Sequence, residues 1–319
     1  MANSLLITGM TGFIGSLLAR RLYNDPAYDR IVCFSRDWHK QEDLRNELGN
    51  NPKFRWFIGD ILDKQRLLRA MNGIDFVLHT ASNKSIVDNF YSPREAALLN
   101  NCVGTQNVVD AAIDSGVKKV LFISSDKSVA SSSAYGASKC LGEYLVIAGN
   151  SYSPHGTRLS ASRYGNVLKS SGSCALVFEK QRVGGVITIT DPTMTRFWIT
   201  ANDACVFVLK CLDEMLGGEV FVPKLPASLV IDLAKAIAPD ARVEIIGIRP
   251  SEKIHELMLS DAESWRTKEL DWNAYRIEPA VKFWESAVGY PGGSPVPQGW
   301  SYSSASATRL TVEQLRAML

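Results

Sequence analysis

The sequence predicts an α/β protein built on a doubly wound parallel sheet, with a smaller domain in its C-terminal half. Short apolar runs alternate with helical patterns throughout the first half of the chain. Near-continuous apolar strands separated by helices are typical of a parallel sheet that is covered on both faces. After Tyr164 the rhythm changes, because loops rich in glycine and proline separate shorter elements.

Six strands are predicted, and the clearest helical patterns lie between them. The strands are Ser4–Thr8, Arg30–Ser35, Phe54–Gly59, Phe76–Thr80, Lys119–Ser124 and Thr157–Tyr164, and the helices include Phe13–Asn24, Arg94–Ser115 and Tyr135–Ala148. Six β-α repeats of this kind predict a first domain over residues 1–165. We expect the chain to return to this domain at about residues 191–222 and to form the second domain mainly from residues 166–319.

Composition is ordinary for a globular enzyme and excludes several classes of partner. The 319 residues carry a formal charge of +2, which gives no reason to expect nucleic acid or an anionic membrane. No apolar run is long enough to span a bilayer, and the N-terminus enters a strand without a leader pattern, so we expect a cytoplasmic protein. The six cysteines and four histidines show no metal-ligand spacing, so no metal site is predicted.

A glycine-rich turn follows the first strand and opens a helix. Its sequence is Thr8-Gly9-Met-Thr-Gly12-Phe-Ile-Gly15. Glycines at this spacing allow a tight turn, a close approach of the backbone to a pyrophosphate and close helix packing, while the helix N-terminus supplies N–H donors to the anion. The turn predicts a dinucleotide site, with cofactor contacts from Gly9, Thr11, Gly12, Phe13, Ile14 and Gly15.

The end of the second strand predicts which dinucleotide binds. A site for NAD usually has an acidic residue here, but this chain places Ser35 and Arg36 first, with Lys40 nearby. A hydroxyl and a guanidinium suit a 2′-phosphate, so we expect NADP. Asp37 is an alternative contact for ribose hydroxyls, which would favour NAD.

Two further strand ends contribute cofactor candidates. Asp60 and Ile61 follow the third strand and are expected to flank the adenine, although Asp60 is also a candidate helix cap. Thr80 and Ala81 end the fourth strand. Lys84 follows them, where it either reaches the nicotinamide ribose or a sugar phosphate, or is an ordinary solvated lysine.

The residues after the fifth strand are the most informative of the chain. Ser124, Ser125, Asp126 and Lys127 come first, and Tyr135 and Lys139 follow one helical turn apart. Tyrosine and lysine four residues apart share a helix face, and we expect the ammonium to lower the pKa of the phenol so that it acts as a base. Asp126 and Lys127 add an acid and a base that a simple dehydrogenase does not need, and the alternative is a solvated turn.

Taken together, these motifs resemble the extended short-chain dehydrogenase/reductase superfamily, and the second half narrows the match to the inverting UDP-N-acetylglucosamine 4,6-dehydratases. The resemblance includes the Asp126-Lys127 pair and Ser35-Arg-Asp37. Four later stretches also carry it: Arg163-Tyr-Gly-Asn-Val-Leu168, Ile189-Thr-Asp-Pro-Thr-Met-Thr-Arg-Phe-Trp-Ile-Thr200, Val222-Pro-Lys224 and Gly247-Ile-Arg-Pro-Ser-Glu-Lys-Ile-His-Glu256.

This resemblance implies a Rossmann-type enzyme that binds NADP and a UDP-sugar. Tyr135, assisted by Lys139 and by Ser124 or Ser125, would take the proton of the sugar 4-hydroxyl. Neutral Lys127 would remove the C5 hydrogen, provided that burial or Lys139 lowers its pKa, and protonated Asp126 would assist loss of the C6 hydroxyl. The implied product is a 4-keto-6-deoxy sugar inverted at C5. The superfamily further implies a homo-oligomer, a dimer or a hexamer, paired through a helical face such as Arg94–Ser115.

Five residues are candidates for binding the substrate, of which Lys84 lies within residues 1–165 and the other four within residues 166–319. Each has a structural alternative: packing in the core for Arg196, a salt bridge between domains for Arg249 and Glu252, and satisfaction of the loop backbone for Asn166. The substrate-binding candidates are Lys84, Asn166, Arg196, Arg249 and Glu252.

The chain departs from the family pattern in three places. The usual Gly-Ser-Arg-Gly is Lys169-Ser-Ser171-Gly172, the usual Asn-Pro is replaced within Ala130-Ser-Ser-Ser133, and a glycine is replaced by Ser251. The first and third departures bear on the exact sugar or on the oligomer contacts. Separately, three alternatives to the inverting dehydratase stay open. They are a 4-epimerase, a retaining 4,6-dehydratase and a non-catalytic NADP-binding regulator.

Overall fold

A ten-stranded sheet forms the centre of the computed structural model, which describes residues 3–281, 284 and 289–319. Its strand order is β16-β14-β15-β10-β6-β5-β4-β1-β2-β3. The seven strands from β10 to β3 are parallel, whereas β15, β14 and β16 are antiparallel to their neighbours. The strands are β1 (Asn3–Thr8), β2 (Tyr28–Ser35), β3 (Phe54–Ile58), β4 (Phe76–His79), β5 (Lys119–Ile123), β6 (Arg158–Ser162), β10 (Val220–Pro223), β14 (Thr267–Leu270), β15 (Ala274–Ile277) and β16 (Ser294–Pro295).

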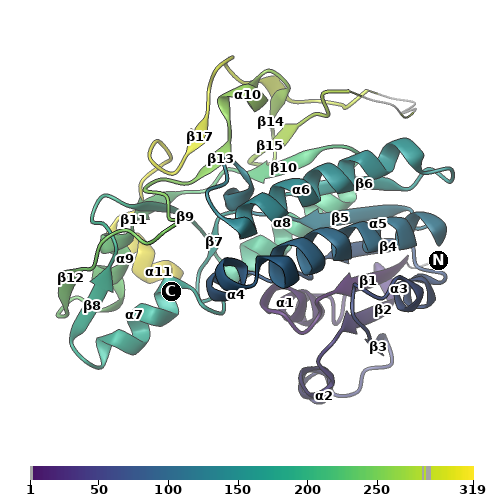
Figure 1. The fold of residues 1–319 in the computed structure, drawn as a ribbon, viewed down its shortest axis with the longest axis horizontal. Coiled ribbons are helices and arrows are strands. Elements are labelled where there is room, and N and C mark those ends of the chain that lie inside the picture. The colour runs from purple at the N-terminus through teal and green to yellow at the C-terminus, as the bar shows by residue number, and fades with distance from the viewer. Residues whose placement is uncertain (1–2, 282–283, 285–288) are drawn as a thin grey trace.

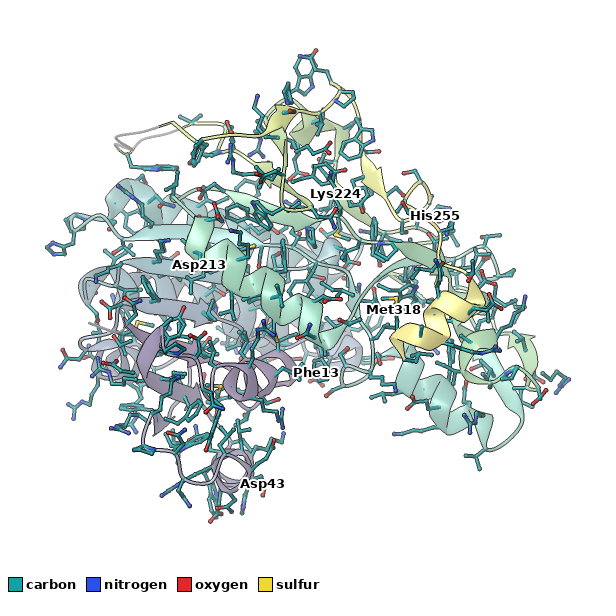
Figure 2. The ribbon with its side chains drawn as sticks, turned by 180° about the vertical axis from the view of Figure 1, so that it is seen from behind. Phe13, Asp43, Asp213, Lys224, His255 and Met318 are labelled. Atoms are coloured by element: carbon teal, nitrogen blue, oxygen red, sulfur yellow. The ribbon has the colours of Figure 1, made fainter. Side chains whose placement is uncertain are left out.

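Helices cover both faces of this sheet. In Figure 1 the helices α5 and α6 lie in front of it, and Figure 2 shows α8 and α1 on the opposite face. The six predicted strands are all present, and the predicted helix over Arg94–Ser115 is formed by η1 and α5 in succession. The helices of this layer are α1 (Phe13–Arg21), α2 (Trp38–Glu47), α3 (Lys64–Met71), α4 (Ile86–Tyr91), η1 (Arg94–Val103), α5 (Gly104–Asp114), η2 (Asp126–Ser128), α6 (Ala134–Gly149), η3 (Asn150–Tyr152) and α8 (Ala201–Glu214).

A second, smaller hydrophobic core lies beside the sheet, in the lobe at the left of Figure 1. Phe178, Trp198 and Leu233 are among its buried members, and the lobe contains the three-stranded sheet β11-β9-β7 and the pair β12-β8. Its elements are β7 (Asn166–Val167), α7 (Cys174–Arg182), β8 (Val186–Ile189), β9 (Thr195–Ile199), β11 (Ala227–Leu229), α9 (Val230–Ile237), β12 (Arg242–Ile245) and α11 (Val312–Met318).

The remaining C-terminal elements pack against the large sheet. They are β13 (Leu257–Leu259), α10 (Asp261–Ser264) and β17 (Tyr302–Ser303), with β13 and β17 forming an antiparallel pair. Met258 and Tyr302 belong to the same hydrophobic core as the first strands. Lys253, just before β13, donates to the carbonyl oxygen of Val129. This segment therefore lies near the carboxyl end of β5, at the edge where an open α/β sheet binds its ligands.

Candidate active site

The glycine turn after β1 packs too closely against neighbouring backbone atoms to carry side chains at Gly9 and Gly15. Gly9 has a positive φ of 66°, and a Cβ there would lie 2.7 Å from the Cα of Ala81. A Cβ on Gly15 would lie 2.6 Å from the carbonyl oxygen of Gly9. Gly12 precedes the first residue of α1 without a capping side chain, which leaves the helix N–H groups available to an anion. The turn fits the pyrophosphate of a dinucleotide.

Strand β4 lies next to β1 in the sheet, and side-chain hydrogen bonds connect the ends of the two strands. The Thr80 hydroxyl donates to the carbonyl oxygen of Thr8 over 2.7 Å, and the Thr8 hydroxyl contacts His79 at 2.7 Å. Burial lowers the pKa of His79 to about 3, and the positive charge of Lys139 adds to this fall. His79, buried between β1 and β4 where the strand order reverses, is therefore neutral at ordinary pH.

Four predicted cofactor residues lie around the end of β2. The Ser35 hydroxyl is buried and accepts a hydrogen bond from Gln41, while the Arg36 guanidinium is 3.3 Å from Asp60. Asp37 accepts from the backbone N–H of Lys40 and caps α2, so this carboxylate has a structural role that the sequence did not predict. Arg36 is the more available of the two charged groups, because its side chain is 62% exposed and not engaged in capping.

Asp60, a candidate cap of the helix that follows β3, does not cap it. Asp63, and not Asp60, caps α3 by accepting from the N–H of Arg66. Asp60 accepts from the N–H of Leu62 as well as pairing with Arg36. The side chain of Ile61 is buried against Gly104 of α5, which leaves the backbone of this segment as the part available to an adenine.

The catalytic candidates are held between β5 and α6. Ser133 caps α6 by accepting from the N–H of Gly136, which fixes where the helix begins. A Cβ on Gly136 would overlap the carbonyl oxygen of Lys127, so this glycine lets the helix start directly against the Asp126–Lys127 segment. This geometry determines the position of Tyr135, which lies in the first turn of α6 beside that segment.

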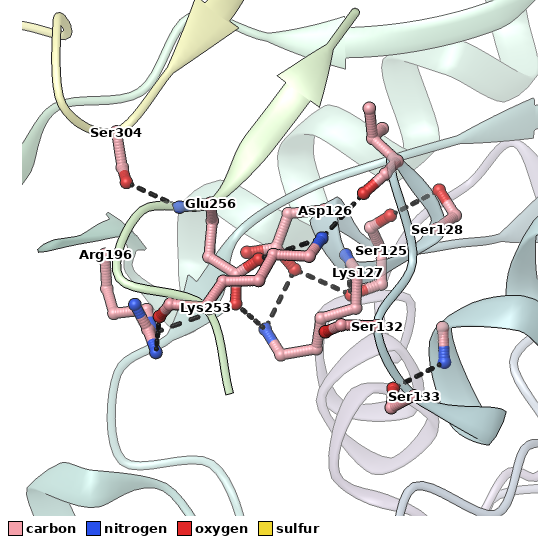
Figure 3. Close-up of polar contacts among 12 residues, drawn as sticks. Ser125, Asp126, Lys127, Ser128, Ser132, Ser133, Arg196, Lys253, Glu256 and Ser304 are labelled. Carbon is pink, nitrogen blue, oxygen red and sulfur yellow. Dashed lines mark hydrogen bonds and ion pairs between the residues drawn. The ribbon is translucent and has the colours of Figure 1, made fainter. Parts of the chain in front are cut away.

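Asp126 and Lys127 form an ion pair within this site (Figure 3). Lys127 Nζ lies 3.0 Å from Asp126 Oδ1, and the Ser125 hydroxyl donates to the same oxygen over 2.8 Å. Burial raises the pKa of the Asp126 carboxyl, an effect that Lys127 opposes and Glu256 reinforces. Its second oxygen, Oδ2, is buried and has no hydrogen-bond partner among the described residues. The Asp126 carboxyl therefore holds a proton to higher pH than the carboxyl of an ordinary aspartate does.

The expected depression of the Lys127 pKa is not found in this structure. Burial opposes the charged form of the amine, but the negative charges of Asp126 and Glu256 outweigh burial and raise the pKa of Lys127. Glu256 Oε1 lies 3.7 Å from Lys127 Nζ, from a segment more than a hundred residues further along the chain. Lys127 is thus held as an ammonium between two carboxylates.

Tyr135 and Lys139 also differ from the expected pairing. Burial raises the pKa of the Tyr135 phenol, and Lys127 and hydrogen bonds to Ser125 and Ser82 offset part of the rise. Lys139 instead donates to the carbonyl oxygen of Ile123 over 2.7 Å, and its amine lies over the Phe122 ring. Burial lowers the pKa of Lys139 to about 7, so the cation that most affects the phenol is Lys127.

Ser124 faces a network that the sequence did not reveal. Its hydroxyl donates to Glu143 over 2.5 Å, and the Ser128 hydroxyl donates to the same carboxylate over 2.8 Å. Arg163 completes the network by bonding Glu143 and also Glu263 of α10. Of the two serines proposed to assist Tyr135, Ser125 contacts the phenol, whereas Ser124 binds Glu143 of α6 instead. Glu143 stands four residues after Lys139, and this spacing was the one signal for it.

The five substrate-binding candidates fall into two groups: Arg196, Lys84 and Asn166, which lie far apart in the sequence, and Arg249 and Glu252, which share one turn. Arg196 (β9) is buried, donates to the carbonyl oxygens of Lys253 and Ile254, and lies 3.8 Å from Glu256. Burial lowers the pKa of Lys84, and the positive charge of Lys127 adds to this fall. Asn166 has a buried Oδ1 without a partner among the described residues.

Arg249 and Glu252 form a turn at the rim of this site. The Glu252 carboxylate accepts from the N–H of Arg249 over 3.1 Å, and Arg249 is exposed. The turn is anchored to the loop before Tyr135 because the Ser132 hydroxyl donates to the carbonyl oxygen of Ser251 over 2.8 Å. All three family departures contain a residue with positive φ: Ala130 (44°), Lys169 (56°) and Ser251 (69°). These three residues adopt a backbone conformation that glycine and asparagine favour.

The strand order, the glycine turn and the Tyr135–Lys139 face define an extended short-chain dehydrogenase/reductase. The chain belongs to the family described as polysaccharide biosynthesis protein, which matches residues 5–278. It is 40% identical over 312 residues to a UDP-N-acetylglucosamine 4,6-dehydratase (inverting) from Campylobacter jejuni, covering 95% of this chain and 92% of that one. These matches confirm the resemblance that the motifs indicated and identify the chain as an enzyme.

Two other relatives extend this comparison. A UDP-glucose 4-epimerase from Rickettsia conorii is 38% identical over 99% of this chain and 95% of its own length. The X-ray structure of Pen from Bacillus thuringiensis superposes with a TM-score of 0.90 at 31% identity, covering 99% of this chain and 96% of that one. In the part of the chain that the structure describes, no helix is long and apolar enough to cross a membrane, and no three acidic, histidine or cysteine side chains could share a metal ion.

Proposed function

We propose that the protein is an NADP-dependent dehydratase that converts UDP-N-acetylglucosamine into a UDP-4-keto-6-deoxy sugar with inversion at C5. The observation that carries the proposal is the buried contact between Asp126 and Lys127 beside Tyr135. Oxidation at C4 needs only a base such as Tyr135, whereas loss of water also needs an acid and a second base. The Campylobacter relative, which bears this activity in its name, supports the same reaction.

The first proton movement belongs to Tyr135. Its phenolate takes the proton of the sugar 4-hydroxyl, with Ser125 hydrogen-bonded to the phenol oxygen and Lys127 lowering the cost of its negative charge. When bound, the nicotinamide supplies reversible hydride transfer at the sugar carbons. Lys139, held at the end of β5 by the Ile123 carbonyl, is proposed to contact the nicotinamide ribose.

The elimination belongs to the Asp126–Lys127 pair. A 4-keto group acidifies the C5 hydrogen, which Lys127 removes in its neutral form while Asp126 gives a proton to the departing C6 hydroxyl. Transfer of one proton from Lys127 Nζ to Asp126 Oδ1, along their 3.0 Å contact, produces both required forms at once. The raised pKa of Asp126 favours this transfer, whereas the raised pKa of Lys127 opposes it, so the neutral amine is the minor form. Reprotonation of C5 from the opposite face, by Tyr135 or a bound water, gives inversion.

Cofactor choice and substrate contacts complete the proposal. Arg36 and Lys40, with Ser35, are proposed to bind the 2′-phosphate of NADP, since Asp37 is engaged in capping α2. Lys84 and Asn166 are proposed to contact the sugar phosphate, and Arg249 and Glu252 the diphosphate and ribose. Arg196 is proposed to reach the diphosphate as well, although its present contacts anchor residues 253–254.

An oligomer is proposed from the outer face of η1 and α6. Leu98, Leu141 and Tyr144 are large apolar side chains exposed on these two neighbouring helices. Surfaces of this kind favour association with a second copy.

A 4-epimerase is the second candidate, because the Rickettsia conorii relative of that name matches almost the whole chain. Incubation with UDP-N-acetylglucosamine and mass spectrometry of the sugar nucleotide separates the two. Loss of one water supports the dehydratase, and an isobaric product supports the epimerase. In deuterated water the dehydratase product should gain one deuterium at C5 and show the C5 epimer in its NMR couplings, whereas retention at C5 would contradict inversion.

A further inference from the structure

A buried carboxylate with no part in the proposed function, Glu256, stands beside the reacting pair. It lies just before β13 and is 4% exposed. Its backbone N–H donates to the Ser304 hydroxyl over 2.9 Å, and Ser304 contacts the Thr195 hydroxyl at 2.7 Å. Figure 3 shows Glu256 directed toward Lys127 from this anchor. The tail of the chain therefore holds the carboxylate in place.

Three cations from three segments of the chain surround this carboxylate: Lys127 (η2), Arg196 (β9) and Lys253, in the loop of Glu256 itself. Oε1 lies 3.7 Å from Lys127 Nζ and 3.8 Å from Arg196 Nε, and Oε2 lies 3.6 Å from Lys253 Nζ. Lys253 also donates to the carbonyl oxygen of Val129 over 2.6 Å, which joins the Glu256 segment to the catalytic loop. Further titratable groups around Lys127 are Asp126, Tyr135, Lys84 and the Cys174 thiol at the start of α7.

The two carboxylates that flank Lys127 have opposite properties. Although burial raises the pKa of Glu256, the charges of Lys127, Arg196 and Lys253 outweigh it and lower the pKa, so Glu256 is ionised. Asp126 has a raised pKa in the same surroundings. When the pKa values of neighbouring carboxyl groups are separated in this way, the group with the higher pKa is the one that accepts a proton and then serves as an acid, while the other remains a fixed negative charge.

We propose that Glu256 is a positioning residue for the elimination step, whose fixed charge holds the Lys127 amine beside Asp126 and tunes the basicity of that amine. This proposal rests on the proposed function, which assigns Lys127 as the base. Glu256 makes Lys127 a stronger base that holds its proton to higher pH, and Lys253 and Arg196 limit the effect by partly neutralising Glu256. Removing Glu256 and removing Lys253 should therefore shift Lys127 in opposite directions.

Competitive labelling with acetic anhydride, read by mass spectrometry, tests this without any substrate. Only the neutral amine reacts, and the 34% exposure of the Lys127 side chain leaves it accessible. At pH 8 we expect about tenfold more labelling of Lys127 in Glu256→Gln, corresponding to a fall of about one unit in its pKa. We expect less labelling in Lys253→Met. Exposed Lys210 and Lys235 serve as internal references, and Glu269→Gln, at an exposed ion pair with Lys224, serves as the matched control.

Kinetics and a conservative variant separate tuning from simple support of the fold. The pH profile of dehydration should move to lower pH in Glu256→Gln, with kcat reduced more than KM is raised. Glu256→Asp keeps the charge and should restore the labelling of Lys127 toward the wild-type value. Unchanged Lys127 labelling in Glu256→Gln, or a parallel change at Lys210 and Lys235, would overturn the proposal. A wild-type enzyme that releases no dehydrated sugar would overturn the proposed function and leave the labelling result intact.

Discussion

Ser132 donates its hydroxyl hydrogen to the main-chain carbonyl oxygen of Ser251 over 2.8 Å, and this bond joins segments 119 residues apart. One segment is the loop between Lys127 and Tyr135, and the other is the Arg249–Glu252 turn. Lys253 strengthens the connection through the Val129 carbonyl. The catalytic loop and the proposed diphosphate-binding turn are therefore fixed relative to each other by hydrogen bonds to backbone oxygens.

Ser251→Gly should stabilise the protein, because Ser251 adopts a φ of 69° that glycine adopts without steric cost. The hydrogen bond from Ser132 uses a backbone oxygen and survives the substitution. We expect the free energy of unfolding to rise by about 1 kcal/mol, measured by urea denaturation. Ser171→Gly, at an exposed position whose φ is not positive, is the matched control and should give no gain.

Gly136→Ala should damage the site by pushing α6 away from the catalytic loop. A methyl group at this position would overlap the Lys127 carbonyl oxygen, and backbone atoms cannot move aside as a flexible side chain can. We expect a loss of ~1–3 kcal/mol of stability and a larger loss of kcat than of cofactor affinity. Ala137→Gly is the control, since its exposed neighbouring position on α6 tests helix propensity alone. A fully active Gly136→Ala enzyme would show that this close approach is unnecessary.

Arg36→Ala should lower affinity for NADP far more than affinity for NAD. The ion pair of Arg36 with Asp60 is exposed and contributes little, so the guanidinium is available to a 2′-phosphate. Loss of a charge-assisted hydrogen bond should weaken NADP binding by about 10- to 100-fold, measured by calorimetric titration of both cofactors. Arg45→Ala, further along α2, should leave both affinities unchanged. Equal losses for NADP and NAD would remove Arg36 from the 2′-phosphate.

The sequence was sufficient to predict those elements whose signals lie within a few neighbouring residues. The first strands are apolar runs of four to eight residues, and the glycine turn and the α6 cap lie within a few residues of each other. The C-terminal strands β16 and β17 have only two residues each, too few to show a periodicity. Helix α11 did carry a signal, because Thr311 and Gln314 form a capping box that sequence analysis overlooked.

The charged networks of the site could not be predicted from local sequence patterns. Glu256 stood inside a recognised motif, but its contacts to Lys127 and Arg196 span separations that only the fold brings together. The same holds for Arg163, whose two glutamate partners lie on α6 and α10. The direction of the Lys127 pKa was predicted wrongly for this reason, since its second carboxylate neighbour was unknown.

Lys139→Met should stabilise the protein most strongly at low pH. Burial lowers the pKa of folded Lys139 to about 7, against an ordinary value of 10.5 when unfolded. Between these values the unfolded chain binds a proton that the folded chain does not, so the wild type gains stability as pH rises from about 7 to about 10.5. We expect an advantage for methionine of up to ~4 kcal/mol near pH 6.5 and ~1 kcal/mol at pH 9.5. An advantage that does not depend on pH, in urea titrations at both values, would contradict the lowered pKa.

Lys127→Ala should stop dehydration and leave oxidation at C4. Tyr135 keeps its bond to Ser125 and Asp126 stays in place, so the 4-hydroxyl can still lose its proton, but no base remains for the C5 hydrogen. Turnover should fall by about 10²- to 10⁴-fold, the usual contribution of a general base. In a single turnover, absorbance at the reduced nicotinamide band should rise and persist, whereas in wild type it should rise and decay. Lys127→Arg is the matched control, because it keeps a positive charge near Tyr135 but cannot act as a base. If Lys127→Arg oxidises C4 more readily than Lys127→Ala and neither dehydrates, Lys127 has two separable roles, a charge for the phenol and a base for C5. Full dehydratase activity in either variant would remove Lys127 from the elimination.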